Sequence, residues 1–292
     1  MHKNQELKIK DQIINFAKMI KFSHTVFALP FALSAVVMAL KNHKFIILDL
    51  IWIIFAMVGA RSAAMGFNRI VDALLDKKNP RTSAREIPLK ILTKKQTGIF
   101  VILSSIVFIF SALMLGKLCF FLCFPVLFFL FFYSYTKRFT KFCHIYLGFG
   151  ISLAPIGAFI AITNTLSLSV IFLSLALMTY IAGFDILYAC QDIDFDKKEN
   201  LFSIPVKYGI KKSMKISCFF HVFMIIFLLC LHISFQMKPV FLLFIFIIGI
   251  LLFIEHKIVQ PDNLKNINIA FFHINSLVSI VLFTGIFVES LI

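Results

Sequence analysis

Two groups of acidic residues lie at the ends of strongly apolar segments, where charged side chains are rare and usually functional. The first group consists of Asp72 and Asp76 together with the amide side chain of Asn68, and the second consists of Asp185, Asp192 and Asp196. Each helical residue advances by about 100° around the axis, so each group returns to one face of a helix. Mg²⁺ binds such oxygen ligands together with the phosphates of a substrate. The spacing therefore predicts a divalent-metal site, and the number of acidic residues is sufficient for one or two metal ions.

Basic residues accompany these acids and favour an anionic substrate. They are Arg81 and Arg85 after the first group, Lys137 and Arg138 at the end of another apolar segment, and Arg61 two turns before Asn68. Guanidinium groups bind phosphate and carboxylate oxygens through paired hydrogen bonds, and an arginine inside a membrane span usually pairs with an acid or an anion. Ordinary solvated acids are the alternative interpretation, which suits Asp194, because it points to the opposite side of the helix from Asp192.

The composition is that of a membrane protein. The chain of 292 residues is 60% hydrophobic, contains 38 Phe and has a mean hydropathy of +0.95, whereas soluble domains are less apolar. Nine apolar segments each approach the ~20 residues that a helix needs to cross a bilayer. They cover residues 22–40, 45–66, 97–116, 118–136, 142–163, 167–190, 213–233, 238–254 and 269–290. We therefore expect an all-α polytopic membrane bundle of about nine transmembrane helices, formed by a single domain over residues 1–292.

The distribution of basic residues predicts how these spans are oriented. If the N-terminus is cytoplasmic, the cytoplasmic segments hold 24 Lys and Arg residues and the opposite side holds only 4. Cytoplasmic loops of membrane proteins carry such an excess. Residues 1–21 and both acidic groups are therefore expected on the cytoplasmic side of a bacterial inner membrane, with the C-terminus outside. Because much of the net charge of +15 serves this orientation, we expect membrane lipid and no nucleic acid as a partner.

Three segments carry these acidic and basic residues. Residues 60–85 read ARSAAMGFNRIVDALLDKKNPRTSAR, residues 133–140 read YSYTKRFT, and residues 183–196 read GFDILYACQDIDFD. Together they resemble the UbiA family of intramembrane aromatic prenyltransferases. The resemblance covers nearly the whole chain. One departure is Arg69, which follows Asn68 where many members have an aspartate. Gly183, in the last segment, permits either close helix packing or the approach of a ligand.

The resemblance implies nine helices and the Mg²⁺-dependent transfer of a polyprenyl group from a polyprenyl diphosphate to an aromatic acid. The implied metal ligands are Asn68, Asp72, Asp76, Asp185, Asp192 and Asp196. The implied substrate-binding residues are Arg61, Arg81, Arg85, Lys137, Arg138, Tyr188 and His24. The implied catalytic residues, which stabilise the departing pyrophosphate while an allylic cation forms, are Asp72, Asp192, Arg85 and Lys137. Asp192 either assists deprotonation of the phenol or serves the metal alone.

The acceptor and two rival functions stay open at this point. The first span, which contains His24, is similar to the 4-hydroxybenzoate polyprenyltransferase-like branch, so 4-hydroxybenzoate for ubiquinone and a dihydroxynaphthoate for menaquinone are both candidates. A secondary transporter would also place acids in membrane spans, although usually near the midplane. A CDP-alcohol phosphatidyltransferase uses a row of aspartates too, but its Asp-Gly-x2-Ala-Arg motif is absent from this chain. The prenyl chain length and the oligomeric state are not predicted.

Overall fold

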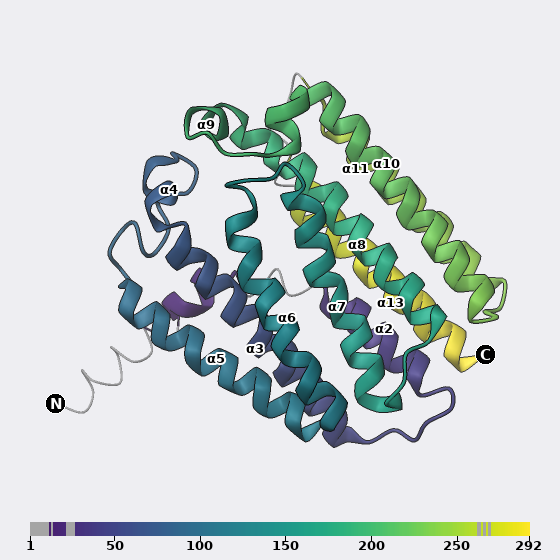
Figure 1. The fold of residues 1–292 in the computed structure, drawn as a ribbon. Coiled ribbons are helices and arrows are strands. Elements are labelled where there is room, and N and C mark those ends of the chain that lie inside the picture. The colour runs from purple at the N-terminus through teal and green to yellow at the C-terminus, as the bar shows by residue number, and fades with distance from the viewer. Residues whose placement is uncertain (1–11, 13, 22–26, 262–263, 265–266, 268–269) are drawn as a thin grey trace.

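The structure is a computed structural model that describes residues 12, 14–21, 27–261, 264, 267 and 270–292. These residues fold into a bundle of helices (Figure 1). The helices are α2 (Leu29–Ala39), α3 (Ile47–Val71), α4 (Ala73–Lys78), α5 (Lys94–Met114), α6 (Lys117–Thr136), α7 (Cys143–Thr163), α8 (Leu168–Ala189), α9 (Ile193–Lys198), α10 (Ile204–Ser234), α11 (Val240–Ile258) and α13 (Asn275–Leu291). A 3-10 turn (Cys190–Asp192) joins α8 to α9, and a π-helical turn (Ala270–Ile274) precedes α13.

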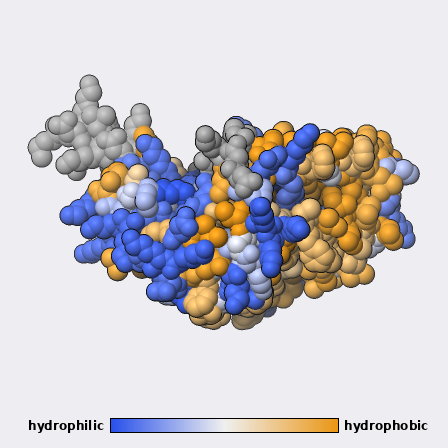
Figure 2. Space-filling view, turned by 90° about the horizontal axis from the view of Figure 1, so that it is seen from above, coloured by the Kyte–Doolittle hydropathy of each residue, from blue (hydrophilic) through white to orange (hydrophobic). Residues whose placement is uncertain are grey.

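The described residues contain 8 helical segments that are long and apolar enough to cross a membrane, and α2 adds a shorter apolar helix of 11 residues. These elements coincide with the nine predicted spans, although residues 22–26 of the first span lie outside the described part of the chain. The predicted polytopic membrane bundle is therefore confirmed. Figure 2 shows the bundle from the end that carries α4 and α9. Hydrophilic residues gather at this end, whereas the side of the bundle is covered by hydrophobic residues.

The middle of the bundle is formed by α8, which packs against α7 on one side and α10 on the other. Its side chains are mostly buried, and they include the fully buried Tyr180. A second closely packed pair is formed by α3 and α5. The helical segments α4 and α9 lie together at one end of the bundle, and the last residue of the chain lies at the opposite end (Figure 1). The connections that carry them, residues 72–93 after α3 and residues 190–203 after α8, are thus brought side by side.

Polar side chains define where the helices next to these connections begin. Thr93 and Gln96 form a reciprocal capping box at the start of α5, which satisfies backbone N–H groups that the helix cannot pair internally. Ser203 accepts a hydrogen bond from the backbone N–H of Val206 at the start of α10. Gly209, at φ 75°, then separates the first turn of α10 from its long apolar part. A left-handed conformation of this kind favours glycine because it has no Cβ.

The sequence analysis predicts that each acidic group lies on one face of a continuous helix, and this prediction is wrong in part. The helical path breaks at Asp72, whose φ of −92° and ψ of 2° separate α3 from α4. In the second group, α8 ends at Ala189 and a tighter 3-10 turn carries the chain into α9. A 3-10 turn has 3.0 residues per turn instead of 3.6, so Asp192 and Asp196 are rotated away from the phase expected relative to Asp185.

Candidate active site

The carboxylate of Asp72 accepts hydrogen bonds from two basic residues at the end of α6. Lys137 Nζ lies 2.6 Å from Oδ2, and Arg138 Nη2 lies 3.1 Å from Oδ1. Asn68, one helical turn earlier, donates its side-chain amide to Oδ2 at 3.1 Å. Asp72 is only 2% exposed, and a buried charge requires partners of this kind. Two of the sequence segments singled out above, one on α3 and one on α6, therefore meet at this carboxylate.

Asp76 is buried one turn beyond Asp72 and has one satisfied and one unsatisfied oxygen. Arg85 Nη1 donates to its Oδ1 at 2.7 Å. Thr82 also donates its hydroxyl to the Asp76 backbone carbonyl, so the loop after α4 folds back over the aspartate. The second oxygen, Oδ2, is buried without a hydrogen-bond partner among the described residues. Because an unpaired buried carboxylate oxygen is costly, this atom is a ready acceptor for a cation.

Asp192 joins the two connections at the hydrophilic end of the bundle. Arg81 Nε donates to Oδ1 at 2.9 Å, and Asn79 Nδ2 donates to the same oxygen at 3.0 Å. Arg81 also donates to the hydroxyl of Tyr188 at 2.8 Å. Burial lowers the pKa of Arg81, but the hydrogen bond and the charge of Asp192 outweigh this effect and raise it above its ordinary value. Arg81 therefore stays charged while it spans from one connection to the other.

Asp185 pairs with a histidine that the sequence did not single out. His144 Nδ1, on α7, lies 2.7 Å from Asp185 Oδ2, and the His144 side chain is only 4% exposed. His144 Nε2 is buried without a partner among the described residues. A histidine on a neighbouring helix, 41 positions away in the chain, has no sequence signal that connects it with Asp185. It holds the carboxylate in one orientation at the edge of the site.

Replacing His144 by alanine is expected to weaken Mg²⁺-dependent binding of geranyl diphosphate by roughly 10- to 100-fold, the usual loss when a residue that orients a metal ligand is removed. The amide of an asparagine can take the place of Nδ1, so His144→Asn should retain most of the affinity. Isothermal titration at several Mg²⁺ concentrations measures the effect. The control is His43→Ala, in the connection after α2. An unchanged Mg²⁺ dependence in His144→Ala would contradict the positioning role.

Asp196 and its neighbours complete the acidic part of the site. Its carboxylate interacts electrostatically with Asp192 and Lys137. Asp194 is exposed, in agreement with the prediction that it points away from the site. Lys78 and Glu199 form an exposed ion pair of 2.7 Å between the two connections. Pairs of this kind contribute little stability, so the buried contacts of Asp72 and Asp76, with the half-buried contacts of Asp192, define the geometry.

The donor set fits a magnesium ion in its chemistry. The described residues form no group of three or more acids, histidines or cysteines close enough to hold a metal as they stand. Asp72, Asp76 and Asp192 are each paired with a basic side chain. The six predicted ligands nevertheless offer oxygen donors, which Mg²⁺ prefers with substrate phosphates completing its shell. The unpartnered Oδ2 of Asp76 supplies an acceptor that none of the described protein groups uses. A metal–diphosphate complex would therefore compete with the basic side chains for these carboxylates.

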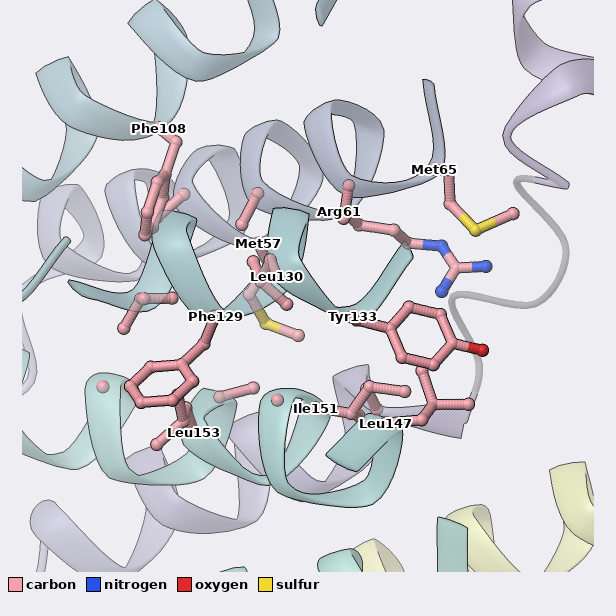
Figure 3. A pocket seen from close by; sticks show the side chains of 18 of the residues that line it. Met57, Arg61, Met65, Phe108, Phe129, Leu130, Tyr133, Leu147, Ile151 and Leu153 are labelled. Atoms are coloured by element: carbon pink, nitrogen blue, oxygen red, sulfur yellow. The ribbon is translucent and has the colours of Figure 1, made fainter. Parts of the chain in front are cut away.

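A cavity of about 400 Å³ begins beside these residues and runs between α3, α5, α6, α7 and α8. Its polar end is lined by residues that include Lys21, Arg61, Asn68, Arg69, Arg85, Tyr133, Asp185 and Tyr188. The rest of its wall is apolar. Figure 3 shows Arg61 and Tyr133 beside each other at one end, with Phe108 and Phe129 towards the other. The cavity therefore has a cationic head next to the acidic groups and a long hydrophobic tail.

Arg61 and Arg69 occupy the cationic head in different ways. Arg61 donates Nη2 to the backbone carbonyl of Lys21 at 3.4 Å, while its Nε is buried without a partner among the described residues. Arg69, the departure from the family pattern, is 4% exposed and donates both Nε and Nη2 to the carbonyl of Met19. Arg69 thus ties the N-terminal segment to α3, whereas Arg61 keeps donor capacity for an anion in the cavity.

Lys21 is a member of this site that sequence reasoning assigned only to membrane orientation. Its side chain lines the cavity with Arg61, Arg69 and Arg85. Burial, followed by repulsion from Arg85, Arg69 and Arg81, lowers the pKa of Lys21 to about 8. The lowered pKa therefore reflects a buried position first and the nearby arginines second. His24 lies outside the described residues, so its predicted place in the acceptor pocket stays a prediction.

The affinity for an anionic ligand is expected to depend on pH through Lys21. Below about pH 8 the lysine is protonated and attracts the ligand, and as pH rises through 8 this attraction is lost. The affinity for geranyl diphosphate is measured at pH 7 and pH 9 in the parent protein and in Lys21→Met. We expect the decrease in affinity between these two pH values to be about tenfold larger in the parent protein. The comparison cancels the ligand's own titration. Equal pH profiles for parent and variant would contradict this assignment.

Comparison with known proteins places this geometry in a family. The model described as the UbiA prenyltransferase family matches residues 28–277. A 4-hydroxybenzoate octaprenyltransferase from Vibrio atlanticus is 28% identical over 160 residues, which are 55% of this chain and 56% of that protein. Another from Methylobacillus flagellatus is 31% identical over 149 residues, or 51% of this chain and 50% of that protein. The chain thus spans about half the length of the curated relatives it matches.

Solved structures share the fold. The apo structure of a UbiA homolog from Aeropyrum pernix K1 has a TM-score of 0.82 and 26% identity, covering 91% of this chain and 98% of that one. A UbiA homolog from Archaeoglobus fulgidus bound to GPP and Mg²⁺ has a TM-score of 0.70 over 95% of this chain and 100% of that one, and its 14% identity shows the fold alone. Because the family model matches most of its residues, the chain belongs to the UbiA prenyltransferase family.

Proposed function

We propose that this integral membrane protein transfers a polyprenyl group from a polyprenyl diphosphate to an aromatic acid. The observation that carries the proposal is the single cavity in which a cationic head adjoins two acidic groups and continues into an apolar tail. A polyprenyl diphosphate has the same division into a charged head and a long hydrocarbon. The relatives named as 4-hydroxybenzoate octaprenyltransferases support prenyl transfer to an aromatic acid and favour it over the transporter.

The acidic residues would hold Mg²⁺ and, through it, the diphosphate. The proposed ligands are Asn68, Asp72, Asp76, Asp185, Asp192 and Asp196. When bound, Mg²⁺ supplies charge that stabilises the leaving pyrophosphate. Whether one or two ions bind depends on how many of these carboxylates exchange their basic partners for metal. The structure of a family member bound to GPP and Mg²⁺ supports this use of a divalent ion.

The basic residues neutralise the diphosphate as its bond to the prenyl group breaks. Arg81, Arg85 and Lys137 each lie within hydrogen-bond distance of a proposed ligand, so a diphosphate held through Mg²⁺ at these carboxylates would be close to all three. Tyr188 accepts a hydrogen bond from Arg81 and lines the cavity, and Arg138 anchors Asp72. The C–O bond of the donor breaks with its electron pair on the pyrophosphate, and positively charged groups preorganised there lower the barrier.

The acceptor ring would lie between the acidic groups and Arg61. We assign the carboxylate of the acceptor to Arg61, whose guanidinium faces the cavity beside Tyr133 (Figure 3). The ring carbon ortho to the hydroxyl then forms a bond to the allylic carbon, and the ring loses a proton. For Asp192 we propose one of two roles, to assist removal of the phenolic proton or to serve the metal alone. Apolar walls exclude water, which would otherwise quench the allylic cation.

The orientation proposed for the protein is that of a bacterial inner-membrane enzyme whose site faces the cytoplasm. The excess of basic residues on the connections next to the site supports a cytoplasmic location. The C-terminal end of α13 lies at the opposite end of the bundle from α4 and α9 (Figure 1). With the site and the N-terminus cytoplasmic, the C-terminus would be outside.

The decisive experiment incubates purified protein in detergent with Mg²⁺, radiolabelled polyprenyl diphosphate and either 4-hydroxybenzoate or 1,4-dihydroxy-6-naphthoate. Label in a prenylated aromatic product establishes the reaction, and the acceptor consumed identifies the quinone class that the product serves. Transfer to neither acceptor, with Mg²⁺-dependent diphosphate binding intact, would restrict the proposal to prenyl transfer with another acceptor. Absence of diphosphate binding in well-folded protein would overturn it.

A further inference from the structure

The cavity extends through most of the height of the bundle. On α3 its lining residues run from Asn68 at the polar end to Ile53, a distance of about 22 Å along a helix that rises 1.5 Å per residue. The far end is lined by residues from the ends of α5, α6 and α7 that lie away from the site. They are Ala112, Leu115, Cys119 and Ile160. The hydrophobic tail is therefore a long channel whose walls come from α3, α5, α6, α7 and α8.

Gly157 on α7 is the place where a side chain would enter this channel without disturbing the protein. It lines the cavity, and a Cβ added to it meets no atom within 4 Å. Gly157 lies ten residues beyond Leu147, which is about 15 Å along the helix. Leu147 itself lies near Tyr133 at the polar end (Figure 3). Gly157 is thus positioned well down the tail, beyond the region that holds the reacting head.

We propose that Gly157 sets the length of prenyl chain that the channel accepts. The inference rests on the proposed function and adds a specificity-determining residue to it. A glycine leaves the channel open from Leu147 to the far end, so a long chain can pass Gly157. A larger side chain at this position would fill the channel there and leave room only for the first isoprene units of the donor. Filling space that a ligand must occupy is costly because packed protein walls yield little.

The test compares Gly157→Leu with Gly249→Leu. Gly249, in the apolar middle of α11, also has no atom within 4 Å of an added Cβ, but it lies in a separate groove with residues of α10. Both substitutions replace a helical glycine by leucine, so they raise helix propensity equally. Prenyl transfer is measured for a series of donors from geranyl diphosphate, with two isoprene units, to octaprenyl diphosphate, with eight. Melting temperatures of both variants confirm that they are folded.

In Gly157→Leu, the ratio of kcat/KM for octaprenyl to that for the shortest active donor is expected to fall by about tenfold or more. Gly249→Leu should keep the parent ratio. If Gly157→Leu lowers kcat/KM by the same factor for all donors, or for none of them, the prenyl chain leaves the bundle before Gly157. The inference is then wrong, while the proposed function stands. If the parent protein transfers no donor to any acceptor, the proposed function itself fails, whatever the variants do.

Discussion

Replacing Asp192 by alanine is expected to lower prenyl transfer by roughly three orders of magnitude, because it removes a proposed metal ligand at the point where charge develops. The same carboxylate accepts hydrogen bonds from Asn79 and Arg81. The change therefore also frees the arginine that joins the two connections. The rate is measured with saturating donor and acceptor, and Mg²⁺-dependent binding of geranyl diphosphate is measured alongside it.

The matched control for this prediction is Asp194→Ala. Asp194 lies two residues away on α9 and is exposed, so its removal changes the local charge equally but leaves the site intact. We expect Asp194→Ala to retain nearly full activity. Asp192→Asn keeps the shape of the side chain and an acceptor oxygen, so a loss in both Asp192 variants indicates that the negative charge is needed. Similar activities for Asp192→Ala and Asp194→Ala would rule out the assigned role.

Introducing a Cβ at Gly148 is expected to cost about 3 kcal/mol of stability, because α7 and α8 have no space for it. A Cβ on Gly148 would lie 2.3 Å from the backbone carbonyl oxygen of Met178. Backbone atoms cannot rotate away as a side chain can, so the two helices must separate. Since α8 forms the middle of the bundle, this displacement spreads to its other contacts. The midpoint of thermal denaturation in detergent should fall markedly in Gly148→Ala.

Gly157→Ala provides the control in the same helix. Its added methyl group points into the cavity and meets no atom within 4 Å, while alanine favours a helix over glycine by roughly 1 kcal/mol. Its denaturation midpoint is therefore expected to equal or slightly exceed that of the parent protein. Equal midpoints for Gly148→Ala and Gly157→Ala would show that the two helices separate without cost, contrary to the close contact in the structure.

Gly183 illustrates a choice that the sequence left open. Either close packing or the approach of a ligand would favour a glycine at that position. In the structure, a Cβ on Gly183 would lie 2.3 Å from Cδ2 of His221. The hydroxyl of Ser217, on the same helix as His221, donates to the Gly183 carbonyl. Helix packing between α8 and α10 therefore explains this glycine.

The sequence by itself determined the class of the protein, the places of its helices and the two acidic groups. Long apolar runs are local properties of the chain, and in a bilayer every backbone polar group must be paired internally, which makes each run a helix. The types of residues in the three motifs were sufficient to predict a metal–diphosphate site with basic partners. Arg61 and Asn68 also line one cavity, as their spacing on a single helix predicted.

The tertiary structure alone decided which groups meet. The pairing of Asp185 with His144, the entry of Lys21 into the cavity and the different roles of Gly148 and Gly157 join elements that are distant in the chain. No local pattern records such contacts. The breaks at Asp72 and at Cys190–Asp192 were missed for a related reason. Helical periodicity assumes a regular path, whereas the path in the structure breaks at Asp72, where Lys137 and Arg138 from another part of the chain bind the carboxylate.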